Sequence, residues 1–246
     1  HIVEPELDIA VHAAVKHGNL RAVARPEPAD AFLIAVPTPF KKGEEAGSIP
    51  TPDLSFIKAA VDSIAPVLKK GDLVILESTS PVGTTEKIAN WLSQARADLT
   101  FPQDVSEASD IRIAHCPERV LPGHVMHELI ENDRIIGGMT LKCAEAAREL
   151  YQCFVRGECL LTTAKTAEMA KLTENAFRDV KSCEDYINLA RLNNNHNAVS
   201  YAKRKIITLK YQELLSELLS DFEIEIRSQI KESLIDGLSS GNYEKR

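Results

Sequence analysis

The fold is decided by residues 73–87, which read LVILESTSPVGTTEK. Leu73 to Leu76 is a short continuous apolar run, typical of a strand that is covered on both faces of a parallel sheet. Pro81 and Gly83 then end the strand, and apolar residues at helical spacing follow them. The stretch therefore predicts a buried strand, a tight polar loop and the first turn of a helix.

The loop between this strand and the helix is rich in hydroxyl groups, and Thr84 or Thr85 is expected to cap the helix. Open α/β sheets bind anionic ligands in such loops, at the carboxyl end of a strand and beside a helix N-terminus. An ordinary capped turn between a strand and a helix explains the same residues equally well. The loop alone does not decide between these two interpretations.

Further strands alternate with helices along the first 163 residues. Apolar runs predict strands at 20–24, 31–36, 111–115, 134–138 and 159–163. Apolar residues at helical spacing predict helices at 5–17, 53–68 and 143–154, with Asp53 as the cap of the second and with loops at 41–52 and 97–109. This alternation predicts a mostly parallel, doubly wound sheet with helices on both faces.

The pattern changes after residue 163, where no later stretch is rich in strand-forming residues. A long helix is expected at 164–192, and apolar residues recur at helical spacing from Ile207 to Leu234. We therefore expect a Rossmann-like α/β domain at 1–163, a long central helix at 164–192 and an all-α tail at 193–246. The apolar stripe of the tail is expected to pack on the body or on a second copy, which would give a homodimer through the long helix and the tail.

The composition limits the class of protein. The chain has 246 residues, of which 44% are apolar and 26% charged, as in an ordinary soluble globular protein. A net charge of −7 argues against a nucleic-acid-binding or membrane-surface protein. No apolar run approaches the roughly 20 residues that cross a bilayer, and no signal peptide opens the chain, so a cytoplasmic location is expected.

Cysteine and histidine patterns do not predict a metal site. The five cysteines form no CxxC pair, which favours reduced thiols over disulfides or zinc ligands. His124 and His127 form an HxxH pair, but no third ligand lies nearby in the sequence. We therefore expect these two histidines to be surface residues.

Three expected strand ends carry polar or charged loops. These are Pro37-Thr38-Pro39, residues 78–85 and Pro117-Glu118-Arg119. In a parallel sheet all three loops lie at one carboxyl edge, so they are able to converge on one ligand. The long helix adds Lys171, Asn175 and Arg178 along one face, although a solvated polar stripe explains that spacing equally well.

Six runs carry a resemblance to a known family: HIVEPELDI, AFLIAVPTPF, VLKKGDLVILESTSPVGTTEK, AHCPERVLPG, RIIGGMT and TAEMAKLTENAFRDV. They resemble the UDP-glucose/GDP-mannose dehydrogenase family, in particular its members that act on UDP-N-acetyl-D-mannosamine. The resemblance covers residues 1 to about 180, and only 41–52 depart from it. It implies an NAD-dependent oxidation of the sugar C6 alcohol to a carboxylate, through an aldehyde and an enzyme thioester, for the synthesis of surface polysaccharide precursors.

The resemblance also implies roles for particular residues. Thr38 and Thr85 would contact NAD, with Thr79 close by. Residues expected to line the UDP-sugar site are Arg119, Val120, Asn175 and Arg178. Glu118 would be the acid/base carboxylate that activates water for thioester hydrolysis. Lys171 would transfer protons and stabilise the oxyanion of the tetrahedral intermediates.

Three features of the family are missing from this sequence. Members open with a strand and a Gly-x-Gly-x-x-Gly turn that binds the NAD pyrophosphate, and they carry a Gly-Gly-x-Cys nucleophile before a UDP-binding domain. Cys183 lacks that context, and the chain departs from the family after Val180. Because the chain begins at His1 and the first βαβ unit is missing, we expect a fragment, a processed product or a trimmed chain. Its exposed sheet edge would make residues 1–180 alone poorly soluble.

Other interpretations of the chain stay open. The first is a dehydrogenase that is inactive as this truncated chain; the second is a non-catalytic helical interaction or effector protein that carries a dehydrogenase remnant. The third is the product of a broken gene, whose tail has no selected function. Arg191 and His196 match the R-x4-H pattern of HEPN ribonucleases, but chance placement explains two residues better.

Overall fold

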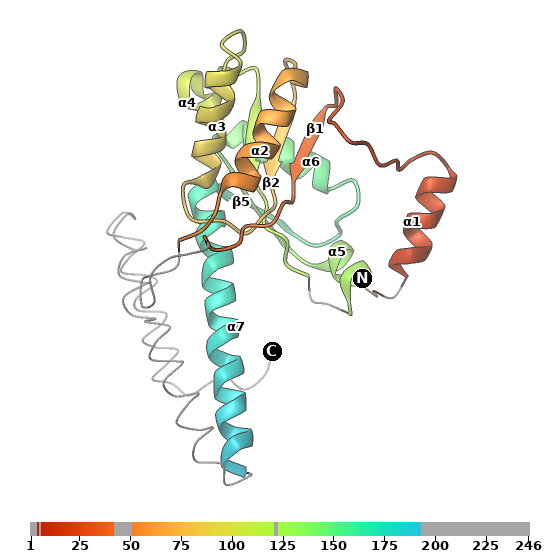
Figure 1. Cartoon of the computed structure of the whole chain (residues 1–246), viewed down its shortest axis with the longest axis vertical. Helices are drawn as coiled ribbons and strands as arrows, with labels where there is room; N and C mark the ends of the chain where they lie inside the picture. The colour runs from red at the N-terminus through yellow and green to blue at the C-terminus, as the bar shows by residue number, and fades with distance from the viewer. Residues whose placement is uncertain (1–3, 5, 42–50, 121–122, 193–246) are drawn as a thin grey trace. The chain divides into compact units, whose positions relative to one another are not determined.

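The computed structural model describes residues 4, 6–41, 51–120 and 123–192 (Figure 1). The chain divides into two compact units, His1–Thr173 and Glu174–Arg246. The long helix α7 (Ala164–Leu192) confirms the expected helix and runs from the first unit into the second. The expected tail lies outside the described residues, and the division expected at residue 163 stays a prediction. In the described part of the chain, no helix is long and apolar enough to cross a membrane.

The first unit contains a five-stranded sheet in the order β1-β2-β3-β4-β5. The strands are β1 (Ala31–Ile34), β2 (Leu73–Leu76), β3 (Arg112–His115), β4 (Arg134–Gly138) and β5 (Cys159–Thr163). β1, β2 and β3 are parallel, whereas β4 runs antiparallel to β3 and parallel to β5. The sheet is therefore mixed, although three neighbouring strands keep the expected parallel arrangement.

The reversal at β4 has a physical cause in the segment before it. A parallel connection needs a crossover element that packs on a face of the sheet. Among the described residues between β3 and β4, the only helix is α5 (Val125–Glu131), and none of its seven residues is buried. Since α5 does not cover the sheet, the chain turns back beside β3 and pairs antiparallel to it.

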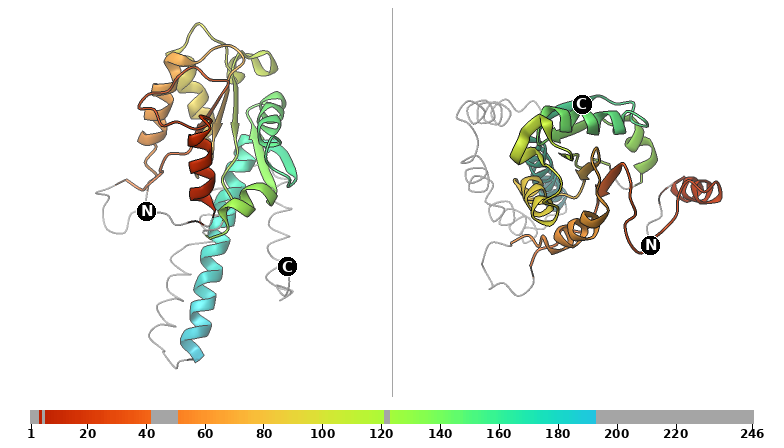
Figure 2. Two further views of the ribbon diagram at one scale, coloured as in Figure 1. Left: turned by 90° about the vertical axis from the view of Figure 1, so that its right-hand side faces the viewer. Right: turned by 90° about the horizontal axis from the view of Figure 1, so that it is seen from above.

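Helices cover both faces of the sheet, as expected for a doubly wound α/β fold (Figure 2). The covering helices are α2 (Ser55–Ile64) and α3 (Thr84–Ala95) on one face and α6 (Leu141–Tyr151) on the other. The chain also forms α1 (Leu7–Lys16), which buries no residue, α4 (Pro102–Val105) and the 3-10 turns η1 (Ala65–Val67) and η2 (Ser106–Ala108). Strand β2 is buried at all four positions. Val74 and Leu76 belong to the core under α2 and α3, whereas Leu73 and Ile75 pack in the core with α6. The central prediction, a strand covered on both faces, is thus confirmed.

Two smaller expectations are wrong. Residues 20–24 form no strand, because Leu20 and Val23 are 45% and 52% exposed and have no sheet to pair with. The segment 97–109, expected as a loop, contains α4 and η2. The segment is able to form α4 because Pro102 occupies the first helical position, where the missing N–H of proline costs no hydrogen bond.

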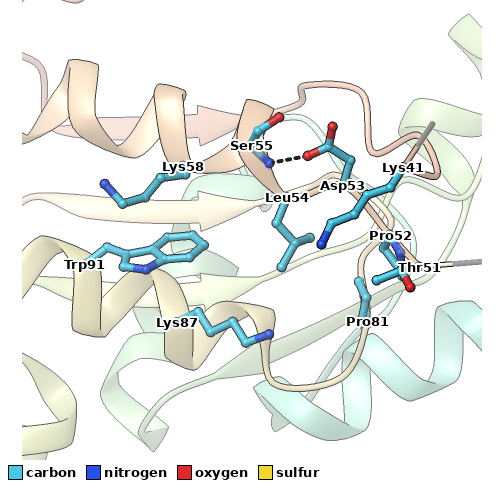
Figure 3. Close-up of a pocket in the computed structure, with 10 residues that line it drawn as sticks. All are labelled: Lys41, Thr51, Pro52, Asp53, Leu54, Ser55, Lys58, Pro81, Lys87 and Trp91. Atoms are coloured by element: carbon cyan, nitrogen blue, oxygen red, sulfur yellow. Dashed lines mark hydrogen bonds between the residues drawn. The ribbon is translucent and has the colours of Figure 1, made fainter. Parts of the chain in front are cut away.

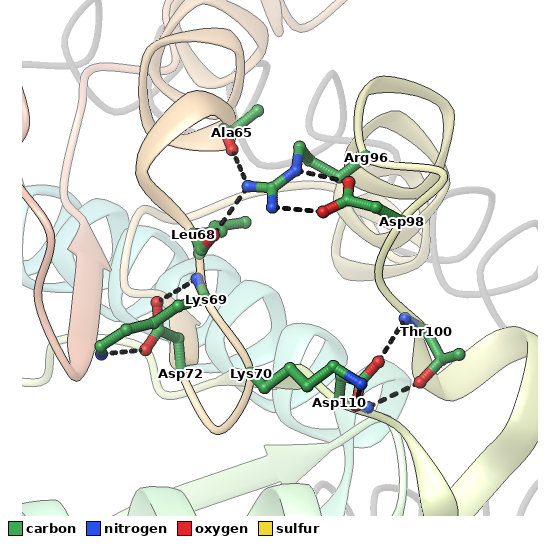
Figure 4. A network of polar contacts seen from close by, with 9 residues as sticks. All are labelled: Ala65, Leu68, Lys69, Lys70, Asp72, Arg96, Asp98, Thr100 and Asp110. Atoms are coloured by element: carbon green, nitrogen blue, oxygen red, sulfur yellow. Dashed lines mark hydrogen bonds and ion pairs between the residues drawn. The ribbon is translucent and has the colours of Figure 1, made fainter.

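A polar network fixes the amino-terminal edge of the sheet (Figure 4). The Arg96 guanidinium donates to the carbonyls of Ala65 and Leu68 at 2.8 and 2.7 Å, which satisfies the end of α2 and η1. Its other nitrogens pair with Asp98, and this contact lowers the pKa of that carboxyl to about 2. Lys69 pairs with Asp72 in the turn before β2. These contacts tie α2 and α3 together and leave the opposite, carboxyl edge for a site.

Strand β1 is the outer strand of the described sheet next to β2. Its Leu33 side chain is 46% exposed, because α6 covers the neighbouring strands on that face but does not reach β1. The exposed edge that the sequence predicts stays a prediction, because the tail lies outside the described residues.

Candidate functional site

The loops that follow β1 and β2 are held together by side chain to backbone hydrogen bonds. Thr38 Oγ1 donates to the Thr79 carbonyl at 2.6 Å, and Ser78 Oγ donates to the Val36 carbonyl at 2.6 Å. These bonds join segments about forty residues apart and require β1 and β2 to be parallel neighbours. The predicted convergence of the first two strand-end loops is therefore confirmed.

The hydroxyl groups of these loops remain able to bind a ligand. Thr38 and Thr79 are both half-buried at the carboxyl edge, and the Thr79 hydroxyl makes no hydrogen bond with the described residues. Ser80 is 3% exposed, and its hydroxyl finds no partner in the same part of the chain. The unpartnered hydroxyl of the half-buried Thr79 fits the ribose hydroxyls and polar groups of a dinucleotide, whereas the Ser80 hydroxyl is covered by the protein.

The third threonine of the expected cofactor site has a different environment. Thr85 is fully buried, and both its hydroxyl and its N–H donate to Glu168 Oε1, at 2.6 and 2.8 Å. The N–H of Gly83 donates to Glu168 Oε2 at 2.6 Å. The expected contact of Thr85 with NAD stays a prediction, and in this structure Glu168 occupies the polar side of that residue.

Glu168 also replaces the expected cap of α3. The N-cap position is Gly83, with a φ of 89° that favours glycine, and neither Thr84 nor Thr85 caps the helix. The Thr84 hydroxyl instead donates to the Pro81 carbonyl at 2.6 Å. The Glu168 carboxylate, which comes from α7, therefore accepts hydrogen bonds from the first N–H groups of α3. It occupies the helix N-terminus at which the sequence allowed either an anionic ligand or an ordinary capped turn.

The Glu168 carboxyl is itself fully buried. Burial raises its pKa, and the hydrogen bonds from Thr85 and Gly83 oppose that rise. A buried carboxylate that accepts three hydrogen bonds is a rigid connection, because moving it would leave all three donors unsatisfied. The loop after β2 and the first turns of α7 are thus fixed to each other.

Lys171 lies three residues after Glu168 on α7, so the two side chains share one side of the helix. Lys171 is buried, with 7% of its surface exposed. Asn175 and Arg178 lie further along α7 in the second unit, where Arg178 pairs with Glu174 at 3.0 Å. The expected roles of these three residues stay predictions.

The loop after β3 carries the other expected residues. Glu118 is exposed, and its carboxylate accepts a hydrogen bond from the N–H of Val120 within the same loop. Arg119 is half-buried; its guanidinium donates to the Asp133 carbonyl at 3.5 Å, and its own carbonyl accepts from Asn132 Nδ2 at 3.1 Å. This loop is therefore tied to the start of β4, and its expected sugar-binding role stays a prediction.

Two residues near the site were missed by sequence reasoning. The first is Glu168, for which a carboxyl among Ala167, Met169 and Ala170 was the available signal of burial. The second is His115, at the end of β3, which is fully buried and has no hydrogen-bond partner for either ring nitrogen in the described structure. Burial lowers the pKa of His115 to about 4, so its imidazole is neutral at physiological pH.

The cysteines of the described chain do not provide an activated thiol. Cys116 is buried beside Tyr151, and burial raises the pKa of its thiol to about 12. Burial also raises the pKa of Cys159, and Cys143 is fully buried against Thr140. Cys153 is exposed at the end of α6, where its thiol donates to the Glu149 carbonyl. The side chain of Cys183 lies outside the described residues.

Comparisons with known proteins agree with this geometry. Residues 1–155 match the NAD-binding domain of the UDP-glucose/GDP-mannose dehydrogenase family. An NDP-N-acetyl-D-galactosaminuronic acid dehydrogenase of Ralstonia nicotianae is 68% identical over 180 residues, which are 73% of this chain and 41% of that protein. The UDP-N-acetyl-D-mannosamine dehydrogenase of Yersinia pestis is 64% identical over the same shares of the two chains. The chain thus spans less than half the length of these relatives.

Solved structures show the same similarity. A UDP-D-ManNAc dehydrogenase from Pyrococcus horikoshii superposes with a TM-score of 0.68 and 39% identity, over 83% of this chain and 47% of that chain. The UDP-N-acetyl-mannosamine dehydrogenase of Staphylococcus aureus gives a TM-score of 0.67 and 40% identity, over 80% and 45% of the two chains. Because the family's NAD-binding domain matches residues 1–155, which are more than half of the chain, the chain belongs to the UDP-glucose/GDP-mannose dehydrogenase family.

Proposed function

We propose that this chain carries the cofactor-binding edge and the proton-transfer lysine of a nucleotide-sugar dehydrogenase. One observation carries the proposal: the loops after β1 and β2 are bonded to each other through Thr38 and Thr79, and the second is bonded through Glu168 to the helix that carries Lys171. Hydroxyls for a dinucleotide and a buried cation are thereby held in fixed positions on neighbouring elements. Preorganised polar groups of this kind are what a hydride-transfer site requires.

NAD bound at this edge would supply the hydride acceptor for oxidation of the sugar C6 alcohol. In the proposal, Thr38 and Thr79 bind the cofactor, and Thr85 supports this edge through its bond to Glu168. Lys171 takes part in transfer of the hydroxyl proton and stabilises negative charge on the reacting oxygen, as a buried cation does best. Where a cysteine outside the described residues supplies the thioester, Glu118 would remove a proton from the water that hydrolyses it.

The proposed substrate is UDP-N-acetyl-D-mannosamine, whose C6 alcohol is oxidised to a carboxylate for surface polysaccharide precursors made in the cytoplasm. The names of the Yersinia and Staphylococcus relatives support this choice, and that of the Ralstonia relative points to another N-acetyl sugar. Residues proposed to line the sugar-nucleotide site are Arg119, Val120, Asn175 and Arg178. Tighter binding of UDP-N-acetyl-D-mannosamine than of a nucleotide-linked N-acetyl-D-galactosamine sugar, in calorimetric titration of the full chain, would support the first substrate, and the reverse order would contradict it.

We further propose that this chain alone completes no turnover, because the described cysteines are buried, have raised pKa values or lie on an exposed helix end. A thioester step needs a nucleophilic thiolate beside the cofactor. The test is NADH formation from NAD and UDP-N-acetyl-D-mannosamine by the purified chain, with the full-length relative from Escherichia coli as the positive control. No NADH is expected from the chain, and measurable turnover would contradict the proposed inactivity.

A further inference from the structure

A pocket of about 500 Å³ opens between the N-terminal parts of α2 and α3 (Figure 3). None of the residues expected for the dehydrogenase reaction lines it. Its volume falls in the range of small-molecule sites, roughly 300–1,000 Å³. The pocket therefore has room for a ligand of its own.

The pocket collects positive charge. Lys41, Lys58 and Lys87 line it, together with a single acidic residue, Asp53. Lys58 is already engaged, since it pairs with Asp62 at 2.5 Å and lies 5.8 Å from the centre of the Trp91 ring. Lys41 and Lys87 are exposed and form no ion pair within the described chain.

Asp53 offsets only part of this charge. Its carboxylate accepts a hydrogen bond from the Ser55 N–H at 2.9 Å. The Ser55 side chain, the Ser55 N–H and the nearby charge of Lys41 lower the pKa of Asp53, so the group stays ionised at the start of α2. Because Lys58 is paired with Asp62, Lys41 and Lys87 against Asp53 leave one net positive charge in the pocket, on a chain whose net charge is −7. A concave surface of one sign of charge concentrates counter-ions of the opposite sign.

The remaining wall is apolar. Leu54, Pro81 and the half-buried Trp91 form it, and Figure 3 shows the Lys41 and Lys87 side chains directed toward the space beside Leu54 and Pro81. A ligand that fits has an anionic group for the two lysines and an apolar body for this wall. We propose that the pocket binds a small organic phosphate, with its phosphate group between Lys41 and Lys87.

The test is calorimetric titration of the full chain with phenyl phosphate, using inorganic phosphate and phenol as comparisons. Saturable binding of phenyl phosphate is expected, with weaker binding of the other two because each lacks one half of the recognition. Trp91 is the only tryptophan of the chain, so a change in its fluorescence on binding would place the ligand in this pocket.

The variants Lys41→Ala and Lys87→Ala are each expected to weaken binding about fivefold, the effect of removing one partly exposed charge contact. Lys70→Ala makes the same change of charge at the opposite end of β2 and is expected to leave binding unchanged. No saturable binding at ~10 mM phenyl phosphate, or an equal loss in Lys70→Ala, would overturn the proposal. The pocket and the dehydrogenase site share no expected functional residue, so either proposal can fail without the other.

Discussion

Replacing Glu168 by glutamine tests the connection on which the candidate site depends. The change keeps the size of the side chain and one acceptor oxygen, which is able to keep both hydrogen bonds from Thr85. The new amide group then faces the Gly83 N–H, which now donates to Glu168 Oε2 at 2.6 Å. The side-chain amide of the glutamine and the Gly83 N–H are both donors, so this hydrogen bond is lost and the part-buried Gly83 N–H has no acceptor.

The cost follows from these contacts. A hydrogen bond to a charged group contributes roughly 1.5–3 kcal/mol, and a negative charge at a helix N-terminus adds about 0.3–1 kcal/mol. The glutamine also removes the cost of burying a charge, which offsets part of the loss because burial raises the pKa of Glu168. We expect Glu168→Gln to lower the free energy of unfolding by about 2 kcal/mol.

The matched control is Glu86→Gln, the same chemical change in the first turn of α3. Glu86 also joins α3 to α7, through Lys165 at 3.1 Å, but both side chains are about half exposed. An exposed pair contributes about 0–1 kcal/mol. The assay is urea unfolding of the full chain, followed by the fluorescence of Trp91, which lies on α3.

The pH dependence gives a second signature. Because folding raises the pKa of Glu168 above 4.5, the folded chain binds more protons between pH 4.5 and that raised value. The stability that this group contributes therefore decreases as the pH rises through this window. The difference between wild type and Glu168→Gln is expected to grow as the pH falls. Equal unfolding energies for Glu168→Gln and Glu86→Gln at all pH values would refute the reasoning.

Three further predictions concern stability and solubility. Folding lowers the pKa of His115 from 6.5 to about 4, so wild type is expected to lose about 3 kcal/mol as the pH falls through this window. His115→Leu should escape that loss in urea unfolding, and the exposed control His12→Gln should not. In Gly137→Ala, the new Cβ would lie 2.4 Å from the Thr163 carbonyl oxygen and 2.7 Å from the Ala167 Cβ, which displaces α7 and costs about 2 kcal/mol. A midpoint of thermal unfolding equal to wild type would contradict that contact. A chain cut after residue 180 is expected to aggregate in sedimentation because β1 exposes its edge, and a soluble chain that unfolds cooperatively would show the opposite.

The parts of the fold that the sequence predicts are those that depend on local pattern. The apolar run from Leu73 to Leu76 defines β2, and its length and flanking turns exclude a helix. Parallel pairing of β1, β2 and β3 then follows from the helices between them, and it brings Thr38 to Thr79. The sequence alone therefore predicts that those two loops converge.

What the sequence does not predict depends on contacts between distant segments. Glu168 caps α3 across more than eighty residues, and no local pattern marks the partner of a buried carboxyl. The reversal of β4 depends on α5 failing to cover the sheet, which follows from packing and not from its apolar content. The burial of His115 results from the covering of both faces of β3, so its unpartnered ring is visible only in the folded chain.

The most direct test of the account is calorimetric titration of the full chain with NAD. If the loops after β1 and β2 form a cofactor edge, NAD binds saturably, and Thr79→Val weakens binding about fivefold through one lost hydrogen bond. The same change on β5, Thr162→Val, is expected to leave the affinity unchanged. No binding of NAD by the wild-type chain, or equal binding by wild type and Thr79→Val, would contradict the cofactor site proposed at this edge.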